Sequence, residues 1–224
     1  MINAIMSGNV QEFIISMLLR LPIIFLSLSV HEVAHGYAAY KLGDPTARNL
    51  GRLSLNPIKH LDPIGFICML LCGFGWAKPV PINTRYFKKP KRDMAITGAA
   101  GPISNLLLAF IFALLARVAE IVFFTLPATS SLTVNVYVLL ILFLQIGVSI
   151  NITLAVFNLL PVPPLDGSRI FLGFLPTDTY FKIMRYERYI SLGIMIALFL
   201  GLLDAPISFI SNIFYRLIEI IIPF

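Results

Sequence analysis

Long apolar runs alternate with short polar segments along this chain of 224 residues. A membrane-spanning helix needs about 20 consecutive, mainly apolar residues. Such runs predict five spans, of which the last two are short: residues 12–30, 95–124, 134–160, 189–203 and 205–223. The pattern therefore predicts an all-α polytopic membrane protein, a bundle of about five transmembrane helices that forms a single membrane-embedded domain over residues 1–224.

Residues 43–94 depart from this helical pattern, because they are rich in Gly, Pro and Asn. Their apolar core, "IGFICMLLCGFGW", is too short to cross about 30 Å as a helix, which favours a re-entrant or interfacial element. The stretch "GFGWAKPVPIN" alternates proline with apolar residues from Pro79 to Ile82, a pattern that rejects a helix and suits an edge strand. We therefore expect a small membrane-associated β element between the first two spans. Irregular backbone at this depth also predicts a cavity in the protein.

Composition agrees with a membrane protein: 58% of the residues are apolar and 12% are charged, against roughly 25% charged residues in soluble domains. The mean hydropathy is +0.88. The apolar run at the N-terminus lacks a basic leading region and a small-residue cleavage site, so we interpret it as a retained helix. Cys68 and Cys72 lie in an apolar stretch expected near the reducing cytoplasm, so reduced thiols are predicted.

The basic residues predict how the chain is threaded through the membrane. Lysine and arginine gather in residues 41–94 and 161–188, whereas residues 125–133 have no charge. Because basic residues accumulate on the cytoplasmic side, the two basic loops are expected inside, and the N-terminus and residues 125–133 outside. The net charge of +6 then reflects threading and contact with the lipid bilayer of the cell membrane. No nucleic-acid partner is expected.

The sequence "HEVAH" ends the first predicted span. His31 and His35 are one helical turn apart, so both imidazoles can reach one metal ion. Glu32 is placed to take a proton from a water at that ion, and H-E-x-x-H is a zinc-hydrolase signature. Ionisable residues beside an apolar span are costly, by about 2.5 to 3.5 kcal/mol at a helix centre, and they mark function by default.

Two histidines do not complete a catalytic zinc site, which usually has three protein ligands. His60 and Asp166 are the candidates for the third. Asp166 follows the third span in "NLLPVPPLDG", where an Asp-Gly turn that caps a helix end is the structural alternative. At 1.5 Å per residue, His31 lies about 27 Å along the first helix, near the cytoplasmic face. The predicted threading brings Asp166 to the same side and a similar depth.

Three ordered motifs now carry a resemblance: "HEVAH" on the first span, "GPISN" at 101–105 opening the second, and "NLLPVPPLDG" at 158–167 ending the third. Over roughly residues 20–170 the chain resembles the site-2 protease family of intramembrane zinc metalloproteases. The stretches "GRLSLNPIKHLDPIG" and "GWAKPVPIN" are similar to the compact prokaryotic members without a PDZ or CBS domain. The resemblance implies a catalytic core over about residues 10–170, followed by C-terminal helices over 177–224.

The resemblance implies one Zn²⁺ per chain, with His31, His35 and Asp166 as its ligands and Glu32 as the general base. Asn158 would steady the substrate carbonyl or the developing oxyanion. The substrate would be received as an added strand by a β element that includes Gly73, Phe74 and Gly75, and Asn105 is a further substrate-binding candidate. For both asparagines a hydrogen bond between helices is the alternative.

The function that follows is hydrolysis of peptide bonds within or near transmembrane segments, as in regulated intramembrane proteolysis. The expected partner is a membrane protein with a transmembrane helix. A membrane metal-ion transporter is an alternative, because buried His and Asp also line ion pathways. Against it, Glu32 would be superfluous, and the inverted repeat often seen in transporters is absent from the sequence. The third possibility is a catalytically silent binding scaffold, which the intact H-E-x-x-H motif disfavours.

Overall fold

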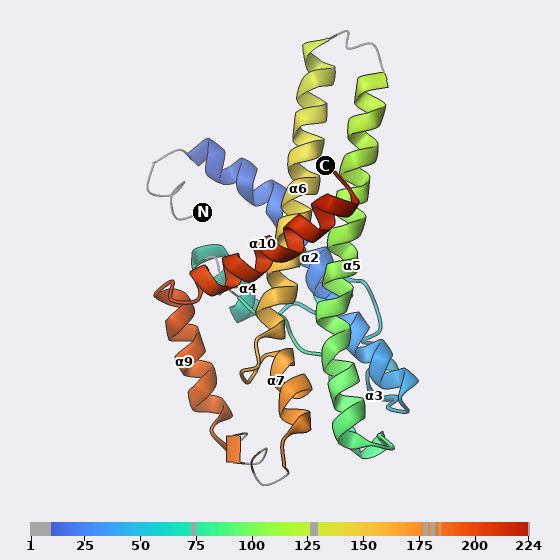
Figure 1. Ribbon diagram of the computed structural model, residues 1–224, viewed down its shortest axis with the longest axis vertical. Helices are drawn as coiled ribbons and strands as arrows, with labels where there is room; N and C mark the ends of the chain where they lie inside the picture. The colour runs from blue at the N-terminus through green and yellow to red at the C-terminus, as the bar shows by residue number, and fades with distance from the viewer. Residues whose placement is uncertain are drawn as a thin grey trace.

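The computed structural model describes residues 10–72, 75–125, 130–176, 179, 182–183 and 185–223. The elements of the first part of the chain are α2 (Val10–Lys41), α3 (Thr46–Asn49), η1 (Pro57–Lys59), α4 (Pro63–Cys72) and η2 (Thr84–Tyr86). Those of the second part are α5 (Pro90–Thr125), α6 (Ser131–Leu159), α7 (Asp166–Phe171), η3 (Leu172–Phe174), α9 (Glu187–Phe199) and α10 (Asp204–Ile221). Figure 1 shows a helical protein in which α5 and α6 run along the long axis.

The core of the bundle lies between α5, α6 and α2. Helix α5 packs most extensively against α6 and next against α2. Its buried face carries small residues, Ala109, Ala113 and Ala116. On α6, a Cβ atom added to Gly147 would lie 2.6 Å from the ring of Phe112. Small residues at helix contacts let backbones approach closely in a membrane, where apolar burial alone does not drive association.

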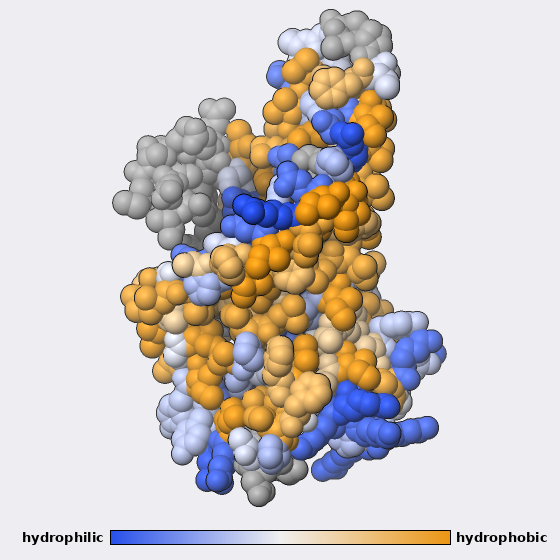
Figure 2. All heavy atoms as spheres, viewed as in Figure 1, coloured by the Kyte–Doolittle hydropathy of each residue, from blue (hydrophilic) through white to orange (hydrophobic). Residues whose placement is uncertain are grey.

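The outward faces of these helices remain apolar. Along α5, for example, Leu107, Ile111, Leu114 and Val118 are each about half exposed. Figure 2 shows that hydrophobic side chains cover much of the visible surface, while hydrophilic ones gather near the lower end and in a patch higher up. Such an apolar surface is suited to contact with the hydrocarbon chains of lipids, which agrees with the predicted membrane protein.

The number of spans differs from the sequence-based expectation. Three helices are long and apolar enough to cross a membrane: Ile14–Lys41, Pro90–Thr125 and Ser131–Leu159. Helices α9 and α10 meet at a bend of 83° and count as one further span at most. The 13-residue α9 extends about 20 Å, less than the hydrocarbon core of about 30 Å. The described ranges therefore contain three helices that could span a membrane, or four spans if α9 and α10 together form one, and the prediction of about five spans is not supported.

The expected β element is not formed by the described residues. The chain leaves α4 and runs through residues 77–83, which make a single isolated antiparallel bridge, Leu61 with Ala77. Pro79 and Pro81 have no N–H group, so they cannot continue a ladder of hydrogen bonds. Gly73 and Phe74, which were expected to belong to this element, lie outside the described residues.

Candidate metal centre

The last turns of α2 bring His31 and His35 together inside the bundle. Both side chains are buried, and their rings meet edge to face with centroids 4.6 Å apart. The two Nε2 atoms are 3.0 Å apart. The helix continues without a break to Lys41, so the i, i+4 spacing of the histidines gives the common face that the sequence predicted.

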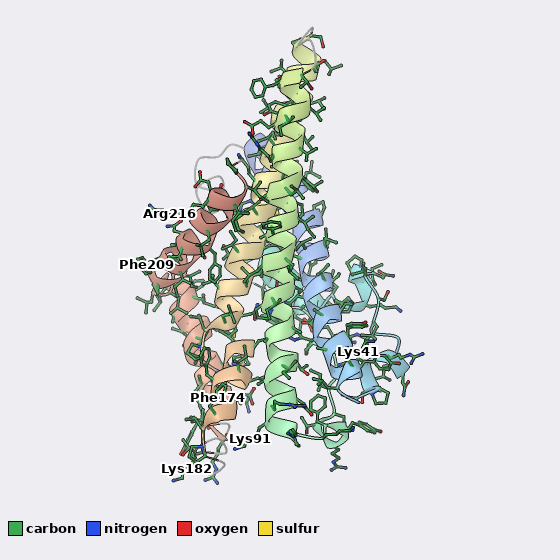
Figure 3. All side chains as sticks on the ribbon, turned by 45° about the vertical axis from the view of Figure 1, so that its right-hand side comes forward. Lys41, Lys91, Phe174, Lys182, Phe209 and Arg216 are labelled. Atoms are coloured by element: carbon green, nitrogen blue, oxygen red, sulfur yellow. The ribbon has the colours of Figure 1, made fainter. Side chains whose placement is uncertain are left out.

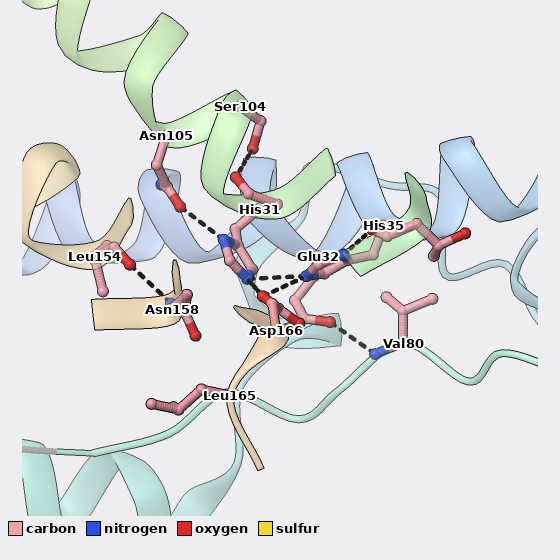
Figure 4. Close-up of polar contacts among 12 residues, drawn as sticks. His31, Glu32, His35, Val80, Ser104, Asn105, Leu154, Asn158, Leu165 and Asp166 are labelled. Carbon is pink, nitrogen blue, oxygen red and sulfur yellow. Dashed lines mark hydrogen bonds and ion pairs between the residues drawn. The ribbon is translucent and has the colours of Figure 1, made fainter. Parts of the chain in front are cut away.

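Asp166, the first residue of α7, completes this group. Its Oδ2 atom lies 3.1 Å from Nε2 of His31 and 3.0 Å from Nε2 of His35. Among the described residues, these three side chains form a group that can hold a metal ion, since their candidate ligand atoms all lie within 4.8 Å of one another. Figure 4 shows the three side chains converging from α2 and from the turn after α6.

The turn that carries Asp166 depends on the glycine that follows it. After α6 ends at Leu159, the chain folds back so tightly that a Cβ atom on Gly167 would lie 2.2 Å from the carbonyl oxygen of Leu159. No side chain fits at that distance. The hydroxyl of Ser168 donates to the carbonyl of Leu165 at 2.7 Å and closes the turn. The "LDG" sequence therefore places the carboxylate against α2.

Helix α5 covers the opposite side of the histidines through the "GPISN" motif. The motif was expected to open the second span, but α5 begins at Pro90, so Gly101 lies well inside the helix. A Cβ atom on Gly101 would lie 2.4 Å from Nε2 of His35 and 2.6 Å from Cε1 of His31. Glycine at this position lets α5 pack directly on the two imidazoles.

The Nδ1 atoms of both histidines are held by α5. His35 Nδ1 lies 2.7 Å from the carbonyl oxygen of Thr97, which can only accept, so the ring donates. His31 Nδ1 lies 2.6 Å from Oδ1 of Asn105, and the amide nitrogen of Asn105 donates to the carbonyl of Ser27 at 3.3 Å. With N–H at Nδ1, each neutral ring directs the lone pair of Nε2 at Asp166.

Three electron-pair donors thus meet at 3.0–3.1 Å and need a proton or a cation between them. Zinc ligands about 2.0 to 2.1 Å from a tetrahedral ion lie roughly 3.3 Å apart, so the donor set fits Zn²⁺. Burial alone would raise the pKa of the Asp166 carboxyl, but the adjacent rings of His31 and then of His35 hold that pKa below its ordinary value. The carboxylate is therefore ionised and able to bind a cation.

Glu32 is buried beside the histidines but does not join the converging atoms. Its Oε2 atom accepts a hydrogen bond of 2.7 Å from the backbone N–H of Val80 (Figure 4). The side chain is thus turned toward residues 77–83. A carboxylate next to the ligand group, and outside it, is placed as a general base would be.

Residues 77–83 are held near both ends by hydrogen bonds to other segments of the chain. The N–H of Lys78 donates to the carbonyl of His60 at 2.8 Å. The N–H of Asn83 donates to the buried carboxylate of Asp44 at 2.7 Å. Arg52 donates to the carbonyl of Lys78 at 2.8 Å and to that of Pro79 at 3.3 Å. These contacts hold a non-helical strip of backbone next to Glu32.

The other predicted site residues are placed as follows. Asn158 donates from its amide to the carbonyl of Leu154 at 2.9 Å, within its own helix. His60 is buried and bonds through Nε2 to the carbonyl of Ser54 at 2.6 Å, so it does not belong to the converging group. Gly75 belongs to the described residues but not to that group. Asn105 of α5 makes the interhelical hydrogen bonds given as the alternative to substrate binding, to His31 and Ser27 of α2 and to Asn151 of α6.

Two contributors were not anticipated from the sequence. The carbonyl of Thr97 is a backbone group, and no side-chain pattern reveals it. Asn151 of α6 is fully buried, and its Oδ1 accepts from the amide nitrogen of Asn105 at 2.9 Å. A polar amide two turns before Asn158 in a largely apolar span was the available signal.

A buried His–His–Asp donor set, with a glutamate beside it and helices able to cross a membrane, defines a membrane-embedded metalloenzyme. The chain belongs to peptidase family M50, whose family model matches residues 20–202. This match confirms the resemblance to the site-2 proteases and the predicted enzyme class, a zinc-dependent intramembrane peptidase. None of the solved structures matches this chain.

Curated relatives agree with the family. YwhC of Bacillus subtilis, named as a zinc metalloprotease, is 46% identical over 166 residues, which are 74% of this chain and 73% of that protein. Rip2 of Mycolicibacterium smegmatis, with the same description, is 32% identical over 148 residues, 63% of this chain and 51% of that protein. MJ0611 of Methanocaldococcus jannaschii is 29% identical over 108 residues, 48% of each chain.

Proposed function

We propose that His31, His35 and Asp166 hold one Zn²⁺ per chain, and that the protein hydrolyses peptide bonds within or near transmembrane segments of other membrane proteins. The observation that carries this proposal is the convergence of two imidazole nitrogens and one carboxylate oxygen at 3.0–3.1 Å. Three protein ligands leave an open position for water and substrate, as catalytic zinc sites require.

In this mechanism, Glu32 moves the protons. Bound zinc would act as a Lewis acid toward the scissile carbonyl and lower the pKa of water at the site. The Glu32 carboxylate takes a proton from the water whose oxygen bonds to the carbonyl carbon. When the C–N bond breaks, the same carboxyl returns the proton to the leaving amine, so that a carboxylic acid and an amine result.

The hydrogen bond between Glu32 and Val80 prepares the carboxylate for this task. It fixes the orientation of one oxygen by a bond to rigid backbone, and the other oxygen is left to face the reacting water. The geometry thus supports the general-base role expected for Glu32.

The substrate has to lose its helical structure before it can be cut, because the carbonyl of a helical peptide bond is already hydrogen-bonded and packed. We place the unwound segment along residues 77–83 and the preceding Gly73, Phe74 and Gly75, by backbone pairing. Arg52 occupies the carbonyls of Lys78 and Pro79, so pairing there requires Arg52 to move. Asn158, at the end of α6, would then steady the substrate carbonyl.

We further place the centre near the cytoplasmic face of the cell membrane, with the N-terminus and residues 125–133 outside. Figure 3 supports this threading, because Lys41, Lys91 and Lys182, from three separate segments, all lie toward the lower part of the bundle. Four further cations, Arg85, Lys88, Lys89 and Arg92, are exposed just before or at the start of α5. Such a concentration of basic residues is typical of a cytoplasmic side.

The variant Glu32→Gln tests the mechanism. Glu32 does not ligate zinc in this proposal, so the variant should keep its metal and its fold while losing a contribution of about 10²- to 10⁴-fold from general-base catalysis. The assay is cleavage of a co-expressed single-span substrate with a helix-loosening Gly or Asn near the cytoplasmic side. Wild-type protein should cut it, and zinc-loaded Glu32→Gln should leave it whole. Wild-type rates in a verified Glu32→Gln protein would refute the mechanism.

The same assay separates a peptidase from a transporter. A transporter predicts no peptide product from either protein and a metal flux that changes with Glu32. A scaffold predicts substrate binding without cleavage by the wild type. Product formation by wild-type protein alone therefore distinguishes the three classes in one experiment.

A further inference from the structure

A chain of buried amides connects α6 to the first histidine. Asn151 and Asn105 are both fully buried. The amide nitrogen of Asn151 donates to the carbonyl of Gly147 at 2.9 Å, and its Oδ1 accepts from the amide nitrogen of Asn105 at 2.9 Å. Oδ1 of Asn105 then accepts from Nδ1 of His31 at 2.6 Å (Figure 4). Three helices thus meet through two side-chain amides.

The backbone determines which way round these amides lie. The carbonyl of Gly147 can only accept, so the nitrogen of Asn151 must face it and Oδ1 must point away. That oxygen in turn requires the nitrogen of Asn105, which leaves Oδ1 of Asn105 to face His31. The other partner of the Asn105 nitrogen, the carbonyl of Ser27, is distant at 3.3 Å. Of the two hydrogen bonds that the Asn105 amide nitrogen donates, the one to Asn151 is therefore the shorter.

The orientation of Asn105 decides what His31 can do. With its oxygen against Nδ1, the ring carries its proton there and Nε2 is free to bind a metal. With the amide reversed, an N–H group would face Nδ1, and the neutral ring would place its proton on Nε2, against Asp166. His35 does not depend on such a choice, because its Nδ1 bonds to the backbone carbonyl of Thr97.

We propose that Asn151 is a positioning residue for the metal centre: through Asn105, it fixes the ring and tautomer of His31 so that Nε2 is presented to the metal. This inference rests on the proposed zinc ligands. Partners behind a metal ligand usually contribute about 10- to 100-fold in metal affinity. Asn151 contacts neither the metal ligands nor a substrate position directly, so its effect must pass through Asn105.

The test compares zinc affinity of purified variants by competition with a chromophoric chelator. Asn151→Leu keeps the bulk of the side chain but removes the acceptor, and should weaken zinc about 10- to 100-fold. Asn151→Asp, in which a protonated carboxyl can donate to the carbonyl of Gly147 and accept from Asn105, should retain more zinc affinity than Asn151→Leu. Val148→Ala is the packing control, because Val148 is fully buried on α6 one turn away, and it should also stay close to wild type. Equal losses in Asn151→Leu and Val148→Ala would overturn the proposal.

A spectroscopic measurement reports on His31 itself. The chain has three histidines, so proton spectra of the Co²⁺-substituted protein should show two exchangeable ring N–H signals from metal ligands. In Asn151→Leu, the signal of His31 should exchange faster with water or disappear, while that of His35 persists. Unchanged signals from both rings, or loss of both, would contradict a role specific to His31.

A double variant checks that Asn151 acts through Asn105. In an Asn105→Ala background, Asn151→Leu should weaken zinc no further, since the link to His31 is already broken. Additive losses would contradict the proposal. Failure of this inference differs from failure of the proposed function. Wild-type protein without stoichiometric zinc would refute the zinc site. Stoichiometric zinc in the wild type, together with an unchanged zinc affinity in Asn151→Leu, would refute only the positioning role.

Discussion

Gly101 of α5 lies directly on His35 of α2, so closely that a methyl group at Gly101 would stand 2.4 Å from the imidazole Nε2. This nitrogen is also 3.0 Å from the carboxylate of Asp166. At this position, α5 therefore has room for the hydrogen atom of glycine but not for a methyl group. Both the packing of α5 on α2 and the geometry of the metal ligands therefore depend on a glycine at position 101.

The variant Gly101→Ala should accordingly disturb the centre. The added methyl group must displace α5 or rotate the histidines, and overpacking of this kind typically costs about 1 to 3 kcal/mol. We expect at least a tenfold loss of zinc affinity, equivalent to about 1.4 kcal/mol, measured by chelator competition. Gly193→Ala is the matched control, because a Cβ atom there meets nothing within 4 Å. Equal zinc affinities for both variants would contradict the contact.

Zinc content should separate the two candidates for the third ligand. Metal analysis of purified Asp166→Ala should show little or no zinc, because a site with two protein ligands binds weakly. His60→Ala should retain about one zinc per chain, since His60 bonds to the carbonyl of Ser54 and lies outside the converging group. Undiminished zinc in Asp166→Ala would return His60 to consideration.

Asp44 should contribute to stability more than to chemistry. Its carboxylate is fully buried and accepts from the N–H groups of Thr46 and Asn83 at 3.0 and 2.7 Å. Asp44→Ala leaves both donors without this partner, which typically costs about 1 to 3 kcal/mol for each buried group left unsatisfied. The measurement is unfolding in detergent, with the exposed Asp204→Ala as control. A control that lost as much stability would show that burial of Asp44 is unimportant.

Cysteine labelling should reveal the threading. In a background without Cys68 and Cys72, a cysteine at Ser130 should react with an impermeant reagent in intact cells. A cysteine at Lys88 should react only after permeabilisation, because the basic segment before α5 is expected inside. The reverse pattern would place the centre near the outer face.

The helices that carry the centre were predictable because helical structure is local. Apolar runs predicted both ends of α5 and α6 within five residues and the start of α2 within two, although α2 continues eleven residues past its predicted end, to Lys41. The spacing of His31 and His35 gave their common face directly. Glu32 needed no tertiary information either, since it adjoins a ligand in sequence. These features depend on the 3.6-residue period and on the cost of ionisable groups in an apolar run.

The C-terminal spans were predicted less well, because hydropathy measures composition and not continuity. Gly201, at φ +70°, ends α9 after 13 residues, and the chain turns by 83° into α10. The sequence-based prediction divided the run at Asp204, close to this break, but gave each half a span of its own. The direction of a chain after a turn depends on backbone angles that hydropathy does not contain.

The sequence by itself determined the helix pair of histidines, the neighbouring glutamate and the family resemblance, because each rests on short-range spacing or ordered motifs. Only the tertiary structure decided that Asp166 meets His35 across 131 residues, and that Asn151 and Thr97 stand behind the ligands. Sequence reasoning had left His60 and Asp166 open, because ligand geometry depends on how separate helices pack. That packing depends on Gly101, which lies against the two imidazole rings, and on Gly167, which lies against the backbone of Leu159 and Leu160. Neither position has room for a side chain, and such contacts exist only in three dimensions.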